Sequence, residues 1–435
     1  MFRSFLMSGN TKERKNIAII GTGISGLGAA YLLYPHHNLT IYESNHYIGG
    51  HSRTVDIETQ DGQIAVDTGF IVFNTRNYPL LSALFSHLNV PIEKSDMSFG
   101  VSIDKGWLEY GTMNLKSFFS QKTNIFSPKF YRMIKDILKF NLKSKVYLDC
   151  DPNITLRECL DDLDLGEWFQ KYYLLAMGSA IWSTPISLML DFPASTLVRF
   201  FENHGLLTIQ DHPQWYTVRN GSREYVKRLA DQFSDRILLN TGVIEVVRHQ
   251  NSVTVVDSEG HGKEYDEVIY ACHADQVVKI ANDLNQSEKD ILSSFCYQAN
   301  HAILHSDLSF MPKRKGAWAS WVYLSERGRN QHSDVNGLSL SYWMNNLQPL
   351  NTSTPIIVTL NPSREPSKNL VYDEYWFDHP LFDRKAIEAQ KKMDSIQGKD
   401  RFWFCGAYQR YGFHEDGLLS AVNIAEKMGI KPSWI

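Results

Sequence analysis

The sequence predicts an α/β protein in which a Rossmann-like domain, discontinuous along the chain, carries an α+β domain built on an antiparallel sheet. Three observations predict this architecture. A glycine-rich fingerprint follows the first apolar strand, strand-like runs dominate residues 290–395, and a second strand–loop–helix unit lies near the C-terminus. A chain of 435 residues is too long for one compact core, so two domains are expected.

The first unit begins at residues 16–20, NIAII, an apolar and β-branched run that is typical of a buried parallel strand. GTGISGLGAA follows directly and supplies the G-x-G-x-x-G pattern of a dinucleotide-binding turn. In this pattern Gly21 permits the tight turn, Gly23 lets backbone amides approach a pyrophosphate, and Gly26 allows close packing of helix on strand. The helix start adds partial positive charge, so we predict that this turn, including Ser25, binds a dinucleotide.

The next strand is LTIYE, and Glu43 closes it at the distance from the glycines that the fingerprint requires. A carboxylate at this position can accept hydrogen bonds from both hydroxyls of an adenosine ribose, and it disfavours a 2′-phosphate. We predict that Glu43 holds this ribose and that Ser44 also contacts the bound dinucleotide. The fingerprint alone leaves NAD and FAD as alternatives.

The residues after Glu43 favour a longer ligand. SNHYIGGHSRT places a second glycine turn and a cation directly after the acidic strand, and VDTGFIVFN adds a further tight turn at Asp67 and Gly69. This arrangement suits a doubly anionic ligand that lies extended across the domain.

At these motifs the sequence resembles the FAD-dependent amine oxidase superfamily, which includes monoamine and polyamine oxidases, protoporphyrinogen oxidase and phytoene desaturases. The resemblance implies a GR2-type FAD-binding domain. The chain departs from the family pattern at His51, where arginine is usual, and at Phe70, where a second glycine is usual. The FAD contacts that the resemblance implies in this region are Gly50, His51, Arg53, Thr54, Asp67, Thr68, Gly69 and Phe70.

Two later segments are expected to complete the FAD-binding domain. TVRNGSREYVKRL predicts a strand, a turn and a helix start, and alternating strands then lead to DEVIYA. DRFWFCGAY is a further apolar strand, and EDGLLSAVNIAEKMG is a helix that ends at a glycine. The resemblance places the backbone of Val243 at the adenine and the start of the last helix at the flavin ring, with contacts from Gly406, Asp416, Gly417 and Leu418.

The remaining segments are expected to form a substrate domain. We predict a loose tail over residues 1–15, an FAD-binding domain from residues 16–90, 205–285 and 396–435, and a substrate domain from residues 91–204 and 286–395. AWASWVYL, LSLSYWMNNLQ and PIIVTLNP predict strands of an antiparallel sheet, and HPLFDRKAIEAQKKM predicts a helix that leads back to the FAD-binding domain.

Strand alternation sends the neighbours Tyr342 and Trp343 to opposite faces, so one of them should face the cofactor cavity. The family resemblance implies a lysine near the flavin, but YQANHAILHSD, where we expect it, contains none; Asn300 or His301 would occupy that place. This absence favours a dehydrogenase, desaturase or isomerase over an amine oxidase. No catalytic base is assigned, and the candidates for catalytic residues are Asn300, Tyr342, Trp343, Tyr411 and His414.

A basic helix is predicted in the middle of the chain, where Ser127-Pro128 reads as its N-cap and first residue. Residues 116–145 contain eight basic side chains and one acid, Asp136, with apolar residues at helical spacing. Such a helix could rest on an anionic membrane surface, or it could cap the substrate domain with a solvated basic face. Both interpretations stay open.

Bulk composition excludes several classes of protein. A net charge of −4 gives no electrostatic case for nucleic acid. Five scattered cysteines without a CxxC pair argue against a disulfide framework and a zinc site, and no metal site is predicted. We expect a cytoplasmic protein, with peripheral contact at the inner membrane surface through residues 116–145 as an alternative. Because no cysteine falls in a linkage motif, we expect FAD to be bound non-covalently.

Over residues 16–430 the chain looks like one bacterial-type subgroup of the superfamily, carried by DTGFIVFN, SYWMNNLQ and FCGAYQRYGFHEDGLLSA. Members often occur beside, or fused to, cyclopropane fatty acid synthases, which implies a lipid acyl substrate and such an enzyme as a partner. The expected function is an FAD-dependent oxidoreductase that takes a hydride from, or redox-cycles on, an apolar substrate at flavin N5. The alternatives are a flavin amine oxidase and a non-catalytic flavin-binding partner of a lipid-modifying enzyme.

Overall fold

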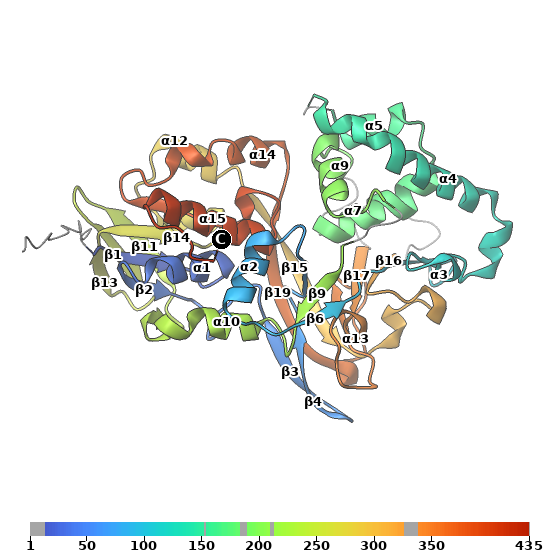
Figure 1. Cartoon of the computed structure of the whole chain (residues 1–435), viewed down its shortest axis with the longest axis horizontal. Coiled ribbons are helices and arrows are strands. Elements are labelled where there is room, and N and C mark those ends of the chain that lie inside the picture. The colour runs from blue at the N-terminus through green and yellow to red at the C-terminus, as the bar shows by residue number, and fades with distance from the viewer. Residues whose placement is uncertain (1–13, 152–153, 183–188, 209–212, 326–337, 435) are drawn as a thin grey trace, which may run out of the picture.

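The computed structural model describes residues 14–151, 154–182, 189–208, 213–325 and 338–434, which form two lobes (Figure 1). One lobe surrounds a parallel sheet, and the other combines a large sheet with a group of helices. The predicted loose tail lies outside the described residues except for Arg14 and Lys15. Among the described helices, none combines the length and the apolar character needed to cross a bilayer.

A five-stranded sheet, parallel throughout, forms the centre of the first lobe. Its strands come from three separated parts of the chain, which confirms the predicted discontinuous Rossmann-like fold. Most of their side chains are buried, as expected where both faces of a parallel sheet are covered. In spatial order the strands are β10 (Ile237–Leu238), β2 (Asn38–Tyr42), β1 (Asn16–Ile20), β14 (Glu267–Tyr270) and β20 (Phe402–Phe404).

The two faces of this sheet pack into separate cores. Ile17 and Ile19 of β1 point into one core, and Ala18 and Ile20 point into the other, because successive residues of a strand alternate. The first core is built from α1 (Ile24–Leu33), α2 (Pro79–His87), α10 (Arg223–Ala230) and α15 (His414–Lys427). The second is built from β11 (Val243–Arg248), β12 (Val253–Asp257), β13 (Gly262–Tyr265), α11 (Ala274–Ile280), α12 (Gln286–Leu292) and α14 (Arg384–Gln390).

A seven-stranded sheet forms the floor of the second lobe, and every neighbouring pair except β16–β7 is antiparallel, as the sequence predicts. Its order is β19 (Val371–Leu381), β15 (Cys296–His305), β18 (Ile357–Leu360), β17 (Leu338–Trp343), β16 (Trp321–Ser325), β7 (Phe99–Ile103) and β8 (Leu108–Gly111). The helix predicted from residue 379 starts too early. β19 runs to Leu381, and α14 begins after Asp383, whose side chain accepts a hydrogen bond from the Ala386 amide at 2.8 Å.

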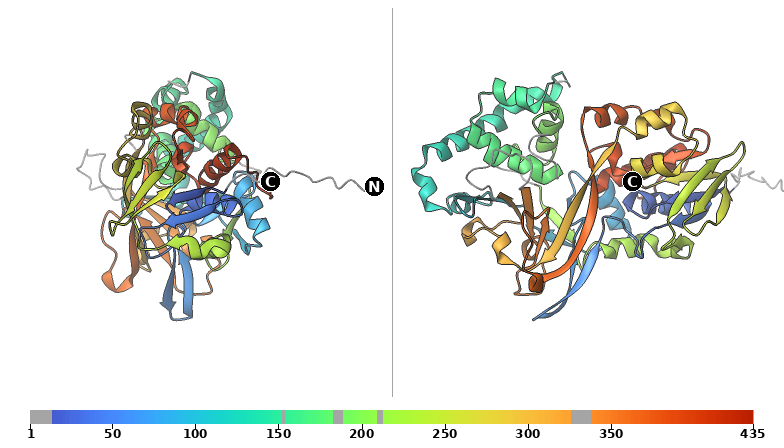
Figure 2. Two further views of the ribbon diagram at one scale, coloured as in Figure 1. Left: turned by 90° about the vertical axis from the view of Figure 1, so that its left-hand side faces the viewer. Right: turned by 180° about the vertical axis from the view of Figure 1, so that it is seen from behind.

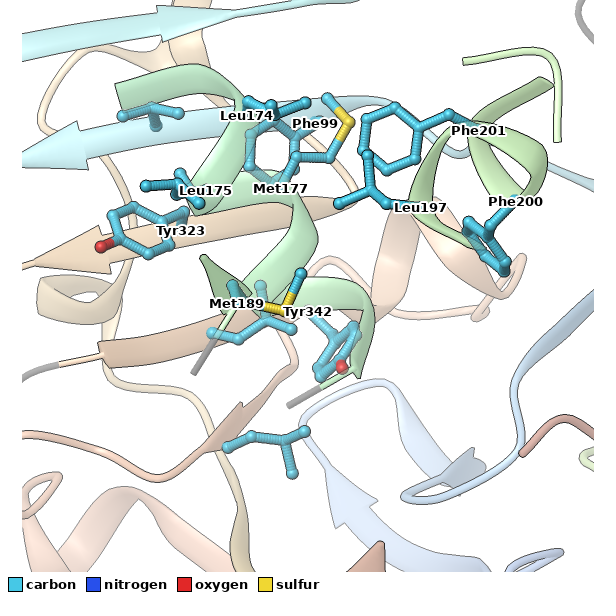
Figure 3. Packing of buried hydrophobic residues seen from close by; sticks show 14 of the residues in the cluster. Phe99, Leu174, Leu175, Met177, Met189, Leu197, Phe200, Phe201, Tyr323 and Tyr342 are labelled. Atoms are coloured by element: carbon cyan, nitrogen blue, oxygen red, sulfur yellow. The ribbon is translucent and has the colours of Figure 1, made fainter. Parts of the chain in front are cut away.

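Helices cover one side of this sheet and share its core. α4 begins where the sequence predicts, because the Ser127 hydroxyl accepts a hydrogen bond from the Phe130 amide at 3.3 Å. Figure 3 shows side chains of α7 and α9 meeting residues of the sheet such as Phe99 and Tyr342. The helices are α3 (Leu115–Phe118), α4 (Pro128–Lys143), α5 (Leu156–Asp162), α6 (Glu167–Phe169), α7 (Leu175–Trp182) and α9 (Ala194–Asn203).

Short strands connect the lobes. The hairpin β3 (Thr54–Thr59) and β4 (Gly62–Asp67) extends away from the parallel sheet (Figures 1 and 2), and Ile57, Ile64 and Val66 belong to the core of the second lobe. This part of the segment 16–90 therefore packs with the lobe to which it was not assigned. The remaining elements here are β5 (Val72–Asn74), β6 (Ile92–Ser95), β9 (Trp215–Val218) and α13 (Met344–Leu347).

Candidate active site

A cavity of about 1470 Å³ lies between the two lobes. The carboxyl ends of the parallel strands open into one half of it, which is where ligands bind in open α/β sheets. Apolar side chains of the second lobe surround the other half. The predicted cofactor residues that line the cavity are Gly21, Gly23, Ser25, Glu43, Ser44, Gly50, His51, Thr68, Gly69, Phe70, Val243 and Gly406.

The turn after β1 is shaped for close approach. Gly21 has a φ of 107°, and an added Cβ would lie 2.8 Å from the carbonyl oxygen of Ala271. Gly26 packs so tightly that its Cβ would stand 2.0 Å from the Gly21 oxygen, which is the role that the fingerprint predicts. At Gly23, by contrast, an added Cβ would meet nothing within 4 Å, and no side chain caps α1 there. The first amides of α1 are therefore accessible from the cavity for an anionic group.

Glu43 lies on the cavity wall at the end of β2, with 6% of its surface exposed. One carboxylate oxygen accepts hydrogen bonds from the amide (3.1 Å) and hydroxyl of Thr22. The other accepts from the amide of Asn45 at 2.8 Å and from its side chain at 3.0 Å. These donors fix the carboxylate beside the glycine turn, in the place that the fingerprint assigns to a ribose-binding acid.

Two further glycine turns stack on the first. An added Cβ at Gly50 would lie 3.0 Å from Gly23 Cα, and one at Gly69 would lie 2.1 Å from the His51 carbonyl oxygen. The Phe70 amide donates to the same oxygen at 2.8 Å. The second and third predicted turns therefore form one layer that places His51 beside the N-terminus of α1.

Two further imidazole rings lie close to His51. His51 lies 6.3 Å from His273 and 5.5 Å from His379, measured between ring centroids, and all three line the cavity. Burial and the neighbouring histidines lower the pKa of His51 well below its ordinary value, and burial lowers the pKa of His379 to about 4. These lowered pKa values favour the neutral rings near pH 7, and His51 stands where the family pattern usually has arginine. Among the described residues no three metal-ligating side chains come together closely enough to hold an ion.

The sequence reasoning missed His273 and His379. His273 directly follows the strand β14, and the carboxyl end of a parallel strand is itself a signal for ligand contact. His379 could not be found in this way, because it lies in the part of β19 that the sequence predicts to be helical.

His414 is a supporting residue of the cavity wall. Its ring stacks on Phe70 with centroids 3.8 Å apart, and Nε2 is 2.8 Å from the Ser52 hydroxyl and 3.2 Å from the Tyr225 hydroxyl. Its remaining exposure is toward the cavity, and burial lowers its pKa to about 3. A ring that stays neutral and is already hydrogen-bonded fixes Phe70 and does not serve as a proton donor near pH 7.

We expect acid to destabilise the flavin-free protein already at pH values well above those at which ordinary carboxylates titrate. Burial lowers the pKa of His204, His305 and His379 to about 4 and that of His414 to about 3. Because the unfolded chain then binds more protons below about pH 6.5, the free energy of unfolding falls as pH drops toward 4.

Asp67 and Asp416 act in the opposite direction, because burial raises each pKa to about 6, but they are outnumbered. From pH 7 to pH 5 the net loss should be on the order of 5 kcal/mol. Urea unfolding at the two pH values measures it, and equal or greater stability at pH 5 would contradict the assignment.

The other half of the cavity belongs to the second lobe. Tyr342 lines it edge-on to Trp321, with ring centroids 4.9 Å apart, and burial raises the pKa of its hydroxyl. Trp343 points to the opposite face of the sheet and packs on Trp318. Tyr411 lines the cavity. Asn300 does not line it, since the residue is buried and its side-chain oxygen accepts from Asn361 at 2.8 Å.

Three residues that are predicted to contact the cofactor do not line the cavity and are bonded to other parts of the protein. Arg53 forms a two-pronged ion pair with Asp373 and lies over the ring of Tyr375, which itself lines the cavity. Asp67 lies behind the wall, where it accepts hydrogen bonds from Thr54 at 2.6 Å and from the Ser222 amide at 2.8 Å. The Thr54 hydroxyl is therefore also bonded within the protein, to the Asp67 carboxylate. The sequence motif locates these residues near the site but does not show their partners.

The start of α15 also differs from the expectation. Its cavity-facing residues are Phe413 and His414, whereas the Asp416 carboxylate turns back to accept a hydrogen bond from the Phe413 amide at 3.0 Å. The Gly417 amide donates to the Phe413 carbonyl at 3.1 Å inside the helix. Leu418 packs on α1, 2.9 Å from the position of a Cβ at Gly28. These three residues therefore position the helix and do not line the cavity.

The fold and the cavity define a two-lobed dinucleotide-binding protein whose ligand meets a second, apolar chamber. The sequence matches the model of the flavin-containing amine oxidoreductase family over residues 24–349. The chain belongs to this family, and it is an FAD-dependent oxidoreductase. A search of curated proteins found no significant match.

Several solved structures share this fold. A fatty acid isomerase from P. acnes that produces CLA superposes with a TM-score of 0.68 at 13% identity, covering 97% of this chain and 100% of the other. A putrescine oxidase bound to putrescine has a TM-score of 0.65 at 14% identity, covering 96% and 99%. A protein described as a protoporphyrinogen oxidase, from Exiguobacterium sp. 255-15, has a TM-score of 0.63 at 15% identity, covering 96% and 99%.

The residues of the first half of the cavity fit FAD. The open space at Gly23, the uncapped amides of α1 and the carboxylate of Glu43 supply what a pyrophosphate and an adenosine ribose require. When bound, FAD supplies a two-electron acceptor and donor, and the protein supplies binding, orientation and electrostatics. The family's lysine has no counterpart on β15, and the cavity-lining residues of the described chain include one lysine, Lys279 of α11.

Proposed function

We propose that this protein is an FAD-dependent oxidoreductase whose substrate is a long-chain acyl lipid. The observation that carries the proposal is the apolar second half of the cavity. Its walls come from the seven-stranded sheet, α4, α7 and α9, and they include Phe99, Ile137, Met177, Phe200, Trp321 and Leu360. Burying an acyl chain against such walls is favourable by roughly 0.8 kcal/mol per methylene group.

Charge is scarce in this half of the cavity. The carboxylate that faces it is Asp96, and one of its oxygens already accepts hydrogen bonds from the Ser98 amide at 2.8 Å, from Ser320 at 2.7 Å and from Asn346 at 2.9 Å. The aromatic residues Tyr342 and Trp321 add polarity only through a hydroxyl and a ring N–H. An extended hydrocarbon fits this lining better than a polycation does.

The chain's own residues supply positioning and exclude water. The raised pKa keeps the Tyr342 hydroxyl protonated, so it can donate a hydrogen bond but does not act as a base near pH 7. His414, hydrogen-bonded and neutral, holds Phe70 at the border between the two halves. Oxidation of an acyl chain to an alkene removes a hydride, which bound FAD would accept, and a proton from the adjacent carbon, which would pass to water or to a neutral group of the cavity. Isomerisation of an unsaturated chain would return the hydride and leave no net oxidation. The likeness of the fold to a fatty acid isomerase supports the same substrate class.

A second candidate is an amine oxidase, and Asp96 is the observation that favours it. A cation could approach the carboxylate oxygen that is not used in those hydrogen bonds, and a putrescine oxidase shares the fold. The missing lysine on β15 and the prior use of Asp96 as an acceptor weigh against this candidate.

Anaerobic flavin spectroscopy on the FAD-loaded protein separates the two candidates. We expect free C16 and C18 fatty acids, or phospholipids that carry them, to perturb or bleach the flavin bands, and mass spectrometry to detect an altered acyl chain. Detection of a product distinguishes isomerisation, which leaves the flavin oxidation state unchanged overall, from net oxidation. Bleaching by putrescine or spermidine and not by any acyl lipid would overturn the proposal.

Two variants sharpen this experiment. Met177→Trp should fill the apolar half and weaken acyl binding by about tenfold or more, while the FAD content stays unchanged. Asp96→Asn should leave the acyl response intact, whereas an amine oxidase that used this carboxylate would lose about 100-fold in kcat/KM.

A further inference from the structure

Exposed apolar side chains are concentrated in one short part of the chain. Of fifteen large hydrophobic residues that are exposed in the described structure, nine lie between residues 107 and 146. The most exposed are Phe126 at 86%, Leu115 at 79%, Leu142 at 78% and Val146 at 71%. Single exposed hydrophobic residues are ordinary on soluble proteins, but a contiguous group marks a contact surface.

The helix α4 is organised in distinct stripes. Phe130, Met133 and Phe140 are buried against the lobe, as the helical spacing predicts. On the opposite side the exposed residues Tyr131, Leu138 and Leu142 follow one another at intervals of seven and four, so they share one outward face. This outward face is too apolar to be explained as a solvated covering of the domain.

Basic residues flank the outward stripe. Residues 112–146 contain one acid, Asp136, which is buried and hydrogen-bonded to the Gly166 amide at 2.9 Å. Within the described chain, the ion pairs of this region engage Arg132, Lys139 and Lys145. The same segment also exposes Lys116, Lys122, Lys129, Lys135 and Lys143. We call residues 113–146 the apolar–basic surface.

The apolar–basic surface is continuous with the active-site cavity. Met113 and Leu115 are exposed and also line the cavity, and the half-buried residues Ile137 and Asn141 of α4 line it as well. Seen from behind in Figure 2, α3 and α4 form the outer edge of the second lobe, at the end remote from the parallel sheet. The apolar half of the cavity therefore opens between α3 and α4, within the surface itself.

We propose that the apolar–basic surface docks on an anionic phospholipid bilayer and places the mouth of the cavity against the lipid. Lysines around exposed aliphatic and aromatic side chains match a bilayer in two ways. The cations meet phosphate headgroups, each contributing roughly 1 kcal/mol near an anionic surface, while the apolar groups enter the acyl boundary. The chain as a whole has a net negative charge, so an anionic bilayer would repel most of its surface. The eight basic residues of this one segment therefore determine which face could approach the bilayer.

Docking would let an acyl substrate pass from the bilayer into the cavity without crossing water. This transfer of substrate rests on the proposed function, whereas the docking itself does not. A protein partner would need shape complementarity around a central anchor residue. Long, separate lysine side chains suit lipid headgroups better than they suit such a shaped interface.

Vesicle flotation with the FAD-loaded full chain tests the docking directly. We expect binding to vesicles of phosphatidylcholine mixed with phosphatidylglycerol, little binding to phosphatidylcholine alone, and a loss of at least tenfold in the partition coefficient between low salt and about 0.5 M salt. Vesicle flotation needs no turnover, so it tests docking even if the protein does not act on acyl lipids. Conversely, if the protein does not bind vesicles, its activity on acyl lipids can still be measured in detergent.

Paired variants make the result specific. Phe126→Ser combined with Leu142→Ser should reduce vesicle binding by about tenfold or more, and Lys135→Glu combined with Lys143→Glu should do the same at low salt. Matched controls on other surfaces are Leu308→Ser with Ile244→Ser, and Lys289→Glu, which should leave binding unchanged.

Equal binding by all variants would overturn the proposal, as would the absence of binding to anionic vesicles at low salt. A third outcome would also overturn it: the protein does not bind vesicles, it self-associates in sedimentation velocity, and the changes at Phe126 and Leu142 abolish this self-association. The apolar–basic surface would then bind a second copy of this chain.

Discussion

Replacing Gly23 by valine should yield a folded protein that does not retain FAD. The backbone at Gly23, with φ −63° and ψ 177°, is accessible to any residue, so the substitution introduces no backbone strain. An added Cβ would meet no protein atom within 4 Å, and Gly23 lines the cavity at the first amides of α1. The new methyl groups would therefore occupy space that a pyrophosphate needs and would leave the fold as it is.

The measurement is the ratio of flavin to protein after purification, followed by titration of flavin-free protein with FAD. We expect the dissociation constant to rise at least about 100-fold, equivalent to about 2.7 kcal/mol of lost binding free energy. Gly262→Val is the matched control, because Gly262 lies on the outer strand β13 and its Cβ would come no closer than 3.5 Å to Thr254. Unchanged FAD content in Gly23→Val would show that the fingerprint does not approach the cofactor.

The local parts of the fold could be predicted because their causes are local. The strand NIAII, the glycine turn after it and the cap at Ser127 depend on residues within a few positions of one another, and the structure has them where the sequence places them. Alternation likewise sends Tyr342 and Trp343 to opposite faces. Which of the two faces the cavity depends on the helices that cover one side of the sheet, and these come from a distant segment.

The partners of charged residues could not be predicted, because they lie far away in the sequence. Arg53 follows the second glycine turn and looks like a phosphate ligand, yet its partner Asp373 comes from an edge strand of the other lobe. The group of His51, His273 and His379 likewise unites three segments. A motif states which residues lie near a turn, whereas the direction of a long side chain depends on the charges that tertiary packing brings to it.

The edge strand β19 was missed for a related reason. VYDEYWFDHPL mixes acids and aromatics, and much of the strand is only partly buried, so it lacks the apolar run that identifies an interior strand. Pairing with β15 along ten residues holds it in the sheet. This pairing also brings His379 to the cavity, so a long-range contact that the sequence does not show supplies part of the candidate site.

Replacing Asp67 by alanine should destabilise the whole molecule and not only remove a cofactor contact. The buried carboxylate accepts hydrogen bonds from the Thr54 hydroxyl at 2.6 Å, the Ser222 amide at 2.8 Å and the Gln348 side chain at 2.8 Å. These donors belong to the hairpin, to the start of α10 and to the second lobe, so the side chain joins three parts of the fold. Its loss leaves buried donors without an acceptor, and the free energy of unfolding should fall by about 3–5 kcal/mol.

Urea unfolding, together with FAD titration of the protein that remains folded, distinguishes the two roles of Asp67. A structural role predicts a lower midpoint and a nearly normal FAD affinity, whereas a direct contact with the cofactor predicts normal stability of the flavin-free protein and weak FAD binding. Asp61→Ala is the control on the same hairpin, since its carboxylate is exposed and accepts from Ser353 at the surface, and it should change stability by no more than about 0.5 kcal/mol. If the two alanine variants proved equally stable, the joining role of Asp67 would be excluded, and the family's expectation of a cofactor contact would again be the better account of this residue.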